Sequence, residues 1–292
     1  MRIHSLFLVS FLFFLASAAA AQELDTAKID AVLGRAGQKS PGVYRFGFPR
    51  TDLHVTVNGL AIKPGLALGS WAAFSGTDAD AHVMGDLVLL EAEVAPVMLK
   101  LRAAGFEISA VHNHLLSEAP QVAYMHYMGH GSSTEIAKQL RDALGQSKTP
   151  LGAPATATPT TQPPPAFVKT VEDTLGRKGN FAGDVLGFGI PRQQAITENG
   201  MTLTAAQGVA EAINFQEAGP GKVATTGDFV LVAAEVNPVI SALQEHNIQV
   251  TALHSHMLTE EPRLFFMHFW SVGDTQSVAD GIKAALSHVA VK

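Results

Sequence analysis

The sequence contains no cysteine, and this absence excludes several classes of protein at once. Disulfide-stabilised scaffolds, thiolate metal sites and cysteine nucleophiles all require that residue. Charged residues are also scarce, at 16% of the 292 residues, whereas hydrophobic residues reach 47%. The formal net charge is −6 and no cluster of lysine or arginine interrupts it, so we expect no binding to nucleic acid. Such a chain has enough apolar residues to fold around a sizeable core.

The N-terminal stretch MRIHSLFLVSFLFFLASAAAAQ has the pattern of a secretory signal peptide. Arg2 supplies the positive charge, an apolar run follows, and small residues at 19–21 precede a cleavage point before Gln22. The apolar run is short for a membrane span, and without cysteine no lipid can be attached to a mature N-terminal thiol. We therefore predict a signal peptide over 1–21 and a periplasmic or secreted protein with no membrane anchor after cleavage.

The rest of the chain is a duplication. HNHLLSEAP at 112–120 is matched by HSHMLTEEP at 254–262, an offset of 142 residues (254 − 112 = 142), and short motifs such as LGR, PR and GD recur at the same offset. Two copies of this length indicate paired domains. A stretch rich in proline, threonine and alanine separates the copies and is typical of an extended linker. The predicted organisation is a first repeat over 22–146, a linker over 147–166 and a second repeat over 167–292, with the two repeats pairing within the chain.

Each repeat contains helical and strand patterns, and strands outnumber helices. A further helix is predicted to begin at Pro96 or Pro238, with Asn237 as a favourable N-cap in the second repeat. The first and last helices of the repeats are predicted over about 24–33, 133–144, 167–175 and 276–287. The predicted fold class is α+β, with two homologous tandem domains.

The two histidines of each H-x-H motif are expected to share a strand face, because side chains alternate along a strand. That face continues Phe106, Ile108 and Ala110 in the first repeat, so the imidazoles are predicted to point inward. A hairpin centred near residue 119 would place His112 opposite His126, and the second repeat offers the same arrangement. Inward imidazoles need partners, because an unsatisfied buried polar group is costly.

A metal ion would satisfy that need, with three histidines and a glutamate as ligands in each repeat. Zinc or copper is the expected divalent ion, with iron or manganese left open. The alternative is that these histidines hydrogen-bond within a polar core. The candidate metal ligands are His112, His114, Glu118 and His126 in the first repeat and His254, His256, Glu260 and His268 in the second.

Arg50 and Arg192 follow FGFP and FGIP and have two possible roles. They bind an anionic ligand, or they pair with Glu93 and Glu235. The glycine-aspartate pairs that contain Asp86 and Asp228 are predicted to lie at strand entries, where turn formation is the expected role.

The pattern GD(L/F)VLxxxEVxPV, followed by ALHSHMLTEEP and FFMHFW, resembles the LppY/LpqO family of exported bacterial proteins. The resemblance covers both repeats and implies export, but no biochemical activity. Some members are named as lipoproteins, and this chain lacks the required cysteine. Three hypotheses follow: an exported metal-binding protein, a metal-dependent enzyme (of hydrolase or oxygenase type) that uses the same residues, and a metal-free module whose repeats clasp a small-molecule ligand.

Overall fold

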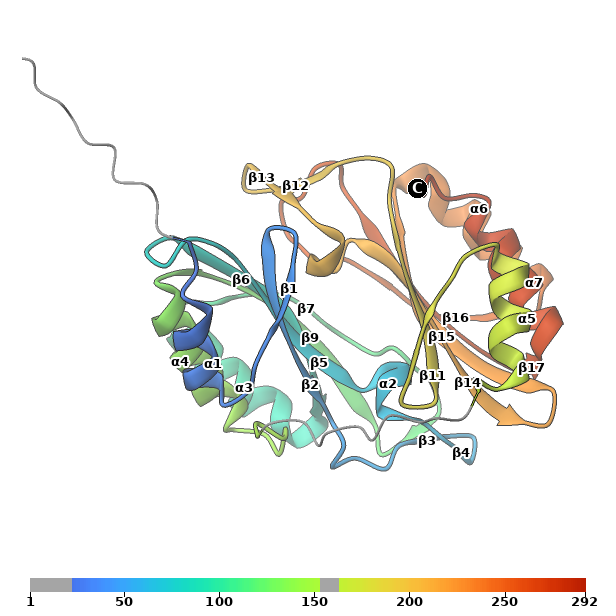
Figure 1. Ribbon diagram of the computed structural model, residues 1–292, viewed down its shortest axis with the longest axis horizontal. Helices are drawn as coiled ribbons and strands as arrows, with labels where there is room; N and C mark the ends of the chain where they lie inside the picture. The colour runs from blue at the N-terminus through green and yellow to red at the C-terminus, as the bar shows by residue number, and fades with distance from the viewer. Residues whose placement is uncertain (1–22, 153–162) are drawn as a thin grey trace, which may run out of the picture.

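The computed structural model describes residues 23–152 and 163–292, and the predicted signal peptide lies outside them. Each repeat forms a six-stranded antiparallel sheet, and the two sheets have the same strand order (Figure 1). The first sheet runs β1 (Gln38–Ser40), β2 (Val43–Pro49), β5 (Gly69–Gly76), β6 (Ala81–Leu90), β9 (Val122–Gly131), β7 (Glu107–His112). The second runs β10 (Asn180–Ala182), β11 (Val185–Pro191), β14 (Ala210–Gly219), β15 (Lys222–Leu231), β17 (Phe265–Asp274), β16 (Gln249–His254).

Three helices cover one face of each sheet, and Figure 1 shows them on the two outer sides of the molecule. The first repeat has α1 (Thr26–Leu33), α3 (Glu91–Ala103) and α4 (Ser133–Leu144), and the second has α5 (Ala166–Leu175), α6 (Ala233–Glu245) and α7 (Thr275–Leu286). Buried residues such as Phe46 and Leu140 fill the space between sheet and helices in the first repeat, as Phe215 and Ile282 do in the second. The predicted α+β class with two tandem domains is confirmed.

The other faces of the two sheets pack against each other and produce a helix–sheet–sheet–helix arrangement. Val88 and Tyr124 of the first sheet share an apolar cluster with Trp270 of the second, and Met84 packs near Phe266 in a related cluster. Short elements cover the edges of this junction: β3 (Thr56–Val57), β4 (Leu60–Ala61), α2 (Pro64–Ala67) and β8 (Glu118–Ala119) in the first repeat, and β12 (Ile196–Glu198), β13 (Met201–Leu203) and the 3-10 helix η1 (Ala205–Gln207) in the second.

Side-chain hydrogen bonds join these edge elements to the opposite repeat. The Lys63 amide donates to Gln216 Oε1 at 2.9 Å, and Asn214 Nδ2 donates to the Leu66 carbonyl at 3.1 Å. The two repeats are therefore paired within the chain by an apolar interface with hydrogen bonds at its edge.

A β-bulge changes which face the histidine-bearing strand presents. The pairing of β7 with β9 shifts register between Ile108 and Ala110, and β16 has the same irregularity. Because an extra residue reverses the alternation of side chains, Phe106 and Ile108 pack toward the helices, whereas Ala110 and His112 face the other repeat. The expectation that these residues share one face was wrong.

The bulge and the longer connection through β8 also change the residue opposite His112. The Cα partner of His112 is Tyr124, and His126 pairs with Ala110. The predicted hairpin centre near residue 119 was therefore wrong, although His112 and His126 still lie on the same face of the sheet with ring centroids 5.0 Å apart.

The helix predicted to begin at Pro96 or Pro238 begins five residues earlier, at Glu91 or Ala233. Glu93 Oε2 accepts a hydrogen bond from the Leu90 amide at 2.9 Å. A glutamate at the third helical position that accepts from the amide of the residue just before the helix favours a helix start at that point. Glu235 accepts from the Val232 amide in the same way. Asn237 thus lies inside α6 and is not its N-cap.

The chain stays attached to the first repeat beyond residue 147, where the linker was predicted to begin. The Lys148 amide donates to Glu93 Oε1 at 2.8 Å, and Arg35 Nη2 donates to the Pro150 carbonyl at 2.9 Å. Residues 153–162 of the predicted linker lie outside the described residues, and α5 begins at Ala166. In the part of the chain that the structure describes, no helix is long and apolar enough to cross a membrane.

Candidate metal centre

The six histidines of the duplicated motifs meet between the two sheets. His112 ends β7, His114 follows it, and His126 lies in the middle of β9; His254, His256 and His268 occupy the same places in the second repeat. Imidazole rings from opposite repeats lie face to face, with centroid distances of 3.5 Å for His112–His254, 3.7 Å for His114–His268 and 3.8 Å for His126–His256.

These contacts have an approximate twofold symmetry. Exchanging each residue for its counterpart 142 positions away converts the pair His114–His268 into His256–His126, and the pair His112–His254 into itself. The sequence predicted one histidine site in each repeat. The structure brings both sets of three histidines into a single cluster at the junction.

Three groups in this cluster could hold a metal ion, since their ligand atoms lie within 4.8 Å of one another. Two of them combine histidines from both repeats, and the other combines an aspartate with the three histidines of the second repeat. The groups are His112 with His126, His254 and His256; His112 with His114 and His268; and Asp228 with His254, His256 and His268.

Backbone hydrogen bonds fix the orientation of several of these imidazoles. His112 Nδ1 lies 3.1 Å from the Asn113 carbonyl, His254 Nδ1 lies 3.2 Å from the Ser255 carbonyl, and His268 Nδ1 lies 2.8 Å from the Gly227 carbonyl. A carbonyl can only accept, so Nδ1 carries the proton in each ring and the lone pair of a neutral imidazole is at Nε2.

All six Nε2 atoms are buried and have no hydrogen-bond partner among the described residues. Buried polar atoms are nearly always satisfied in folded proteins. Six unsatisfied nitrogen atoms in one cluster, with the lone pair of at least three of them fixed at Nε2, form an arrangement that a cation would complete.

Burial also holds these imidazoles neutral. It lowers the pKa of His112 and His254 to about 4 and that of His268 to about 3, and for His254 and His268 the neighbouring imidazoles act in the same direction. The pKa values of His114, His126 and His256 are likewise lowered by burial. Neutral imidazole is the form that binds metal ions.

Asp86 and Asp228 lie against the histidines and were missed as candidate ligands. Asp228 Oδ2 is 3.1 Å from His256 Nε2, and Asp86 Oδ2 is 3.9 Å from His114 Nε2. Burial raises the pKa of Asp86 to about 8, with the charge of Asp228 adding to the shift, and burial also raises the pKa of Asp228. Asp228 belongs to one of the groups that could hold an ion in the described part of the chain, whereas Asp86 borders the cluster and belongs to none of them.

The two aspartates lie in the middle of β6 and β15, so the turn role assigned to them was wrong. The glycine before each aspartate allows the neighbouring strand to approach closely. A Cβ at Gly85 would lie 2.2 Å from the Trp71 carbonyl oxygen, and one at Gly227 would lie 1.9 Å from that of Ala212. The alternation of side chains along the strand could have identified Asp86 as a residue of the junction, because it shares a strand face with Met84 and Val88.

Glu118 and Glu260 belong to none of the groups that could hold an ion in the described residues. Glu118 Oε1 accepts from the Val122 amide at 3.2 Å, and Glu260 Oε1 accepts from the Leu264 amide at 2.9 Å. Both carboxylates thus bond the backbone at the start of the next strand, and the carboxyl groups beside the histidines are those of Asp86 and Asp228.

Reciprocal hydrogen bonds fasten the two H-x-H motifs to the opposite repeat. The Ser109 hydroxyl donates to the His256 carbonyl, and the Thr251 hydroxyl donates to the His114 carbonyl. Ser109 and Thr251 are themselves counterparts in the duplication (251 − 109 = 142). The relative position of the histidines from the two repeats is therefore set by direct contacts between the repeats.

A cleft of about 620 Å³ leads to one side of the cluster. Its walls come from both repeats and include two imidazoles and one aspartate of each, namely Asp86, His114, His126, Asp228, His256 and His268. A small molecule in this cleft would lie beside the histidines.

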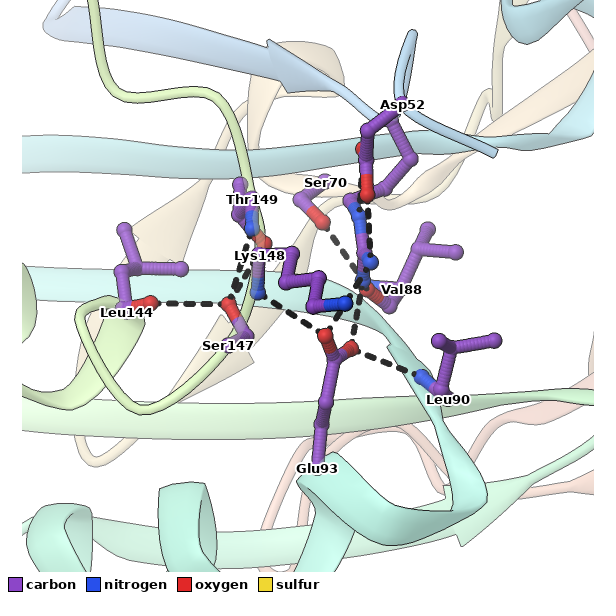
Figure 2. A network of polar contacts seen from close by, with 10 residues as sticks. Asp52, Ser70, Val88, Leu90, Glu93, Leu144, Ser147, Lys148 and Thr149 are labelled. Carbon is purple, nitrogen blue, oxygen red and sulfur yellow. Dashed lines mark hydrogen bonds and ion pairs between the residues drawn. The ribbon is translucent and has the colours of Figure 1, made fainter.

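Arg50 and Arg192 form ion pairs inside the fold, which is the second of the two roles that the sequence left open. Arg50 Nη1 is 2.7 Å from Glu93 Oε2, and Arg192 Nη1 is 2.8 Å from Glu235 Oε2. Figure 2 shows the surroundings of Glu93, whose carboxylate also accepts from the Leu90 and Lys148 amides. Neither arginine lines the cleft.

A separate group lies at the surface of the first repeat and has no counterpart in the second. His82 and His130 are directly opposed across β6 and β9, and His130 Nε2 is 2.5 Å from Asp80 Oδ1. With Asp80 they could also hold an ion. Because these residues form a group that shares no member with the buried cluster, they provide a control for experiments on that cluster.

The fold and the cluster define a duplicated α+β protein with histidines gathered between its repeats. The family model described as Domain of Unknown Function (DUF1259) matches residues 27–146 and 169–288, and the chain belongs to that family. The match confirms the duplication, whereas the LppY/LpqO name is not part of it. No curated protein matches the sequence.

Two solved structures show weak similarity to the chain. The trimeric bacterial microcompartment shell protein PduB is 12% identical with a TM-score of 0.22, over 87% of this chain and 89% of that one. Crystal form I of TP0453 is 12% identical with a TM-score of 0.19, over 90% of this chain and 98% of that one. At these TM-scores neither similarity indicates a shared fold.

Proposed function

We propose that this protein binds divalent metal ions in the cluster between its repeats. The observation that supports the proposal is the convergence of six buried Nε2 atoms without hydrogen-bond partners in the described residues. The imidazoles are held neutral by burial, and carbonyl groups direct three of the Nε2 lone pairs into the cluster. A polar core of hydrogen-bonded histidines, the alternative considered from the sequence, would leave no such set of unsatisfied atoms.

The donor set suits zinc or copper, with iron or manganese open. Imidazole binds all of the later first-row divalent ions, and the chain has no thiolate to restrict the choice. Zinc–nitrogen bonds are about 2.0–2.1 Å, so an ion would draw together ligand atoms that now lie up to 4.8 Å apart. Asp86 and Asp228 are the nearest oxygen ligands, in place of the glutamates expected from the sequence.

Two symmetry-related sites account for the geometry. Site A consists of His112, His114 and His268, and site B consists of His254, His256 and His126. Each takes an H-x-H motif from one repeat and its third histidine from the other. Among the described residues, the three histidines of the first repeat form no group of their own, which favours sharing between repeats, whereas those of the second repeat form one with Asp228.

Elemental analysis tests the proposal. Protein purified from its native compartment, or saturated with zinc and dialysed, should carry about two ions per chain in the buried cluster, counted apart from any ion at the surface group of Asp80, His82 and His130, because each buried site supplies three imidazoles. The double variant His254→Ala/His256→Ala should keep about one, since only site B is destroyed. The variant His82→Ala/His130→Ala is the matched control and should retain the buried ions. Wild-type protein free of metal after both treatments would contradict the proposal.

A third substitution decides whether the sites are shared between repeats. Adding His126→Ala to His254→Ala/His256→Ala should cost no further ion, because all three residues belong to site B. Adding His268→Ala should remove the remaining ion, because His268 belongs to site A. Sites confined to single repeats would give the reverse result in both variants.

We also propose that the mature protein is periplasmic or secreted. Support comes from the charged, apolar and small-residue segments of residues 1–21. N-terminal sequencing of the protein from cell fractions is the direct test, with a mature terminus at Gln22 in the periplasm or medium as the expected result.

A metal-dependent enzyme is the second candidate function, and the cleft favours it. A closed site with four protein ligands suits a structural role, whereas an open position suits chemistry on a bound molecule. Four of the six histidines line the cleft, so a small molecule could reach an ion held there.

A further inference from the structure

The cleft beside the histidines is asymmetric although the two repeats share one fold. Arg45 on β2 corresponds to Gly187 on β11 (187 − 45 = 142). Trp71 and Ala212 also correspond, because they pair with Gly47 and Gly189 at the same place in the two sheets. The first repeat thus contributes a guanidinium group and an indole where the second contributes a hydrogen atom and a methyl group.

Arg45 lines the cleft and lies over Trp71, with its guanidinium carbon 4.6 Å from the ring centroid. It forms no ion pair and no side-chain hydrogen bond with any residue in 23–152 or 163–292, and its Nε atom is enclosed. Arg50 and Arg192 are bonded to carboxylates, and Arg35, which also lines the cleft, donates to backbone carbonyls. Arg45 differs from these arginines because its two terminal nitrogens have no partner among the described residues and are not enclosed.

An unpaired guanidinium that is partly withdrawn from water is costly to a fold. Burial lowers the pKa of Arg45, and the nearby charge of Asp86 opposes that shift. The fold itself does not require the side chain, because the second repeat forms the same strand with glycine at this position. The stacking on Trp71 restricts the guanidinium and keeps it pointed at the cleft.

We propose that the cleft binds a small organic carboxylate, with the carboxylate group paired to Arg45 and the rest of the molecule directed toward the histidines. The planar fork of a guanidinium matches a carboxylate in a two-point contact. A monoanion fits better than a dianionic phosphate, because the cleft supplies one available guanidinium and is also lined by Asp86 and Asp228. The pairing of the carboxylate with Arg45 does not require a bound metal ion. Only the contact between the other end of the ligand and an ion rests on the proposed metal-binding function.

Calorimetric titration with benzoate tests the inference in the full chain, with zinc present and again with chelator. Benzamide serves as the neutral analogue and inorganic phosphate as the dianion. Wild-type protein should bind benzoate in preference to both. Arg45→Met should weaken benzoate binding at least tenfold, because it keeps the apolar stem and removes the fork. Arg177→Met makes the same chemical change outside the cleft lining and should leave the affinity unchanged.

Three outcomes would overturn the inference, each in a distinct way. Benzoate binding that is equal in wild type and Arg45→Met would place the carboxylate elsewhere, even with zinc bound. Tighter binding of phosphate than of benzoate would refute the monoanion class, and no binding of benzoate in either metal state would refute the site. Arg45-dependent binding in chelator with no zinc uptake would sustain this inference while the metal proposal failed. Melting curves of Arg45→Met confirm that the variant is folded.

Discussion

Zinc-saturated protein is expected to be more stable than chelated protein by about 4 kcal/mol for each bound ion when free zinc is a thousand times its dissociation constant, and so by about 8 kcal/mol with both sites filled. The reason is linkage: an ion bound by histidines from both repeats is held only when the repeats are folded and paired. Denaturant unfolding in zinc and in chelator measures the difference, provided that unfolding is reversible. The rise should be seen as a higher midpoint with a similar slope.

His254→Ala/His256→Ala provides the comparison, and its stability should respond less to zinc because one site remains. His82→Ala/His130→Ala should respond as wild type does, since it alters only the surface group. Superimposable wild-type curves in zinc and chelator, together with an elemental count of zero, would show that the cluster is a polar junction without metal.

Glu93→Gln is expected to lower the free energy of unfolding by about 3 kcal/mol, near the lower end of the cost of breaking a buried ion pair. Arg50 is fully buried and Glu93 is 7% exposed. Burial alone would raise the pKa of Glu93, but hydrogen bonds from Arg50 and from the Lys148 and Leu90 amides outweigh burial and lower it. The substitution removes the charge that compensates Arg50, and Asp52, 2.9 Å from Arg50, retains part of that compensation.

The duplication supplies an internal check on this value. Glu235 holds Arg192 and accepts from the Val232 and Ala290 amides, as Glu93 does in the first repeat (Figure 2). Glu235→Gln should therefore cost a similar free energy. Glu135→Gln breaks an exposed pair with Lys138 and should change stability by less than about 1 kcal/mol. Equal effects of all three substitutions would refute a special role for the buried pairs.

Local patterns predicted the parts of the fold that depend on local interactions. The helix predicted over about 133–144 is observed as Ser133–Leu144, because its apolar residues recur at helical spacing. The repeat offset identified the tandem organisation without any structural information. The predicted start of α3 at Pro96 was wrong, because the hydrogen bond from the Leu90 amide to Glu93 begins the helix five residues earlier.

The geometry of the cluster depended on longer-range features. The bulge after Ile108 reverses the strand face, and the pairing of residues across β7 and β9 depends on it. Counting residues across a turn cannot reveal such a bulge. The sequence placed three histidines on inward faces but could not show that inward meant toward the other repeat, because the packing of one sheet on another leaves no periodic signal.

The reciprocal contacts of Ser109 and Thr251 have a consequence for how the cleft can vary. A junction of this kind between two separate, identical chains would form only at sufficient concentration, and every residue in it would occur twice. Joining the halves in one chain replaces the encounter with a tether, for which effective concentrations are about millimolar when the tether is short and flexible. It also allows one half to change alone. Arg45 can have a glycine as its counterpart because the two halves of one chain need not be identical, and asymmetric recognition can thus arise within an otherwise symmetric scaffold.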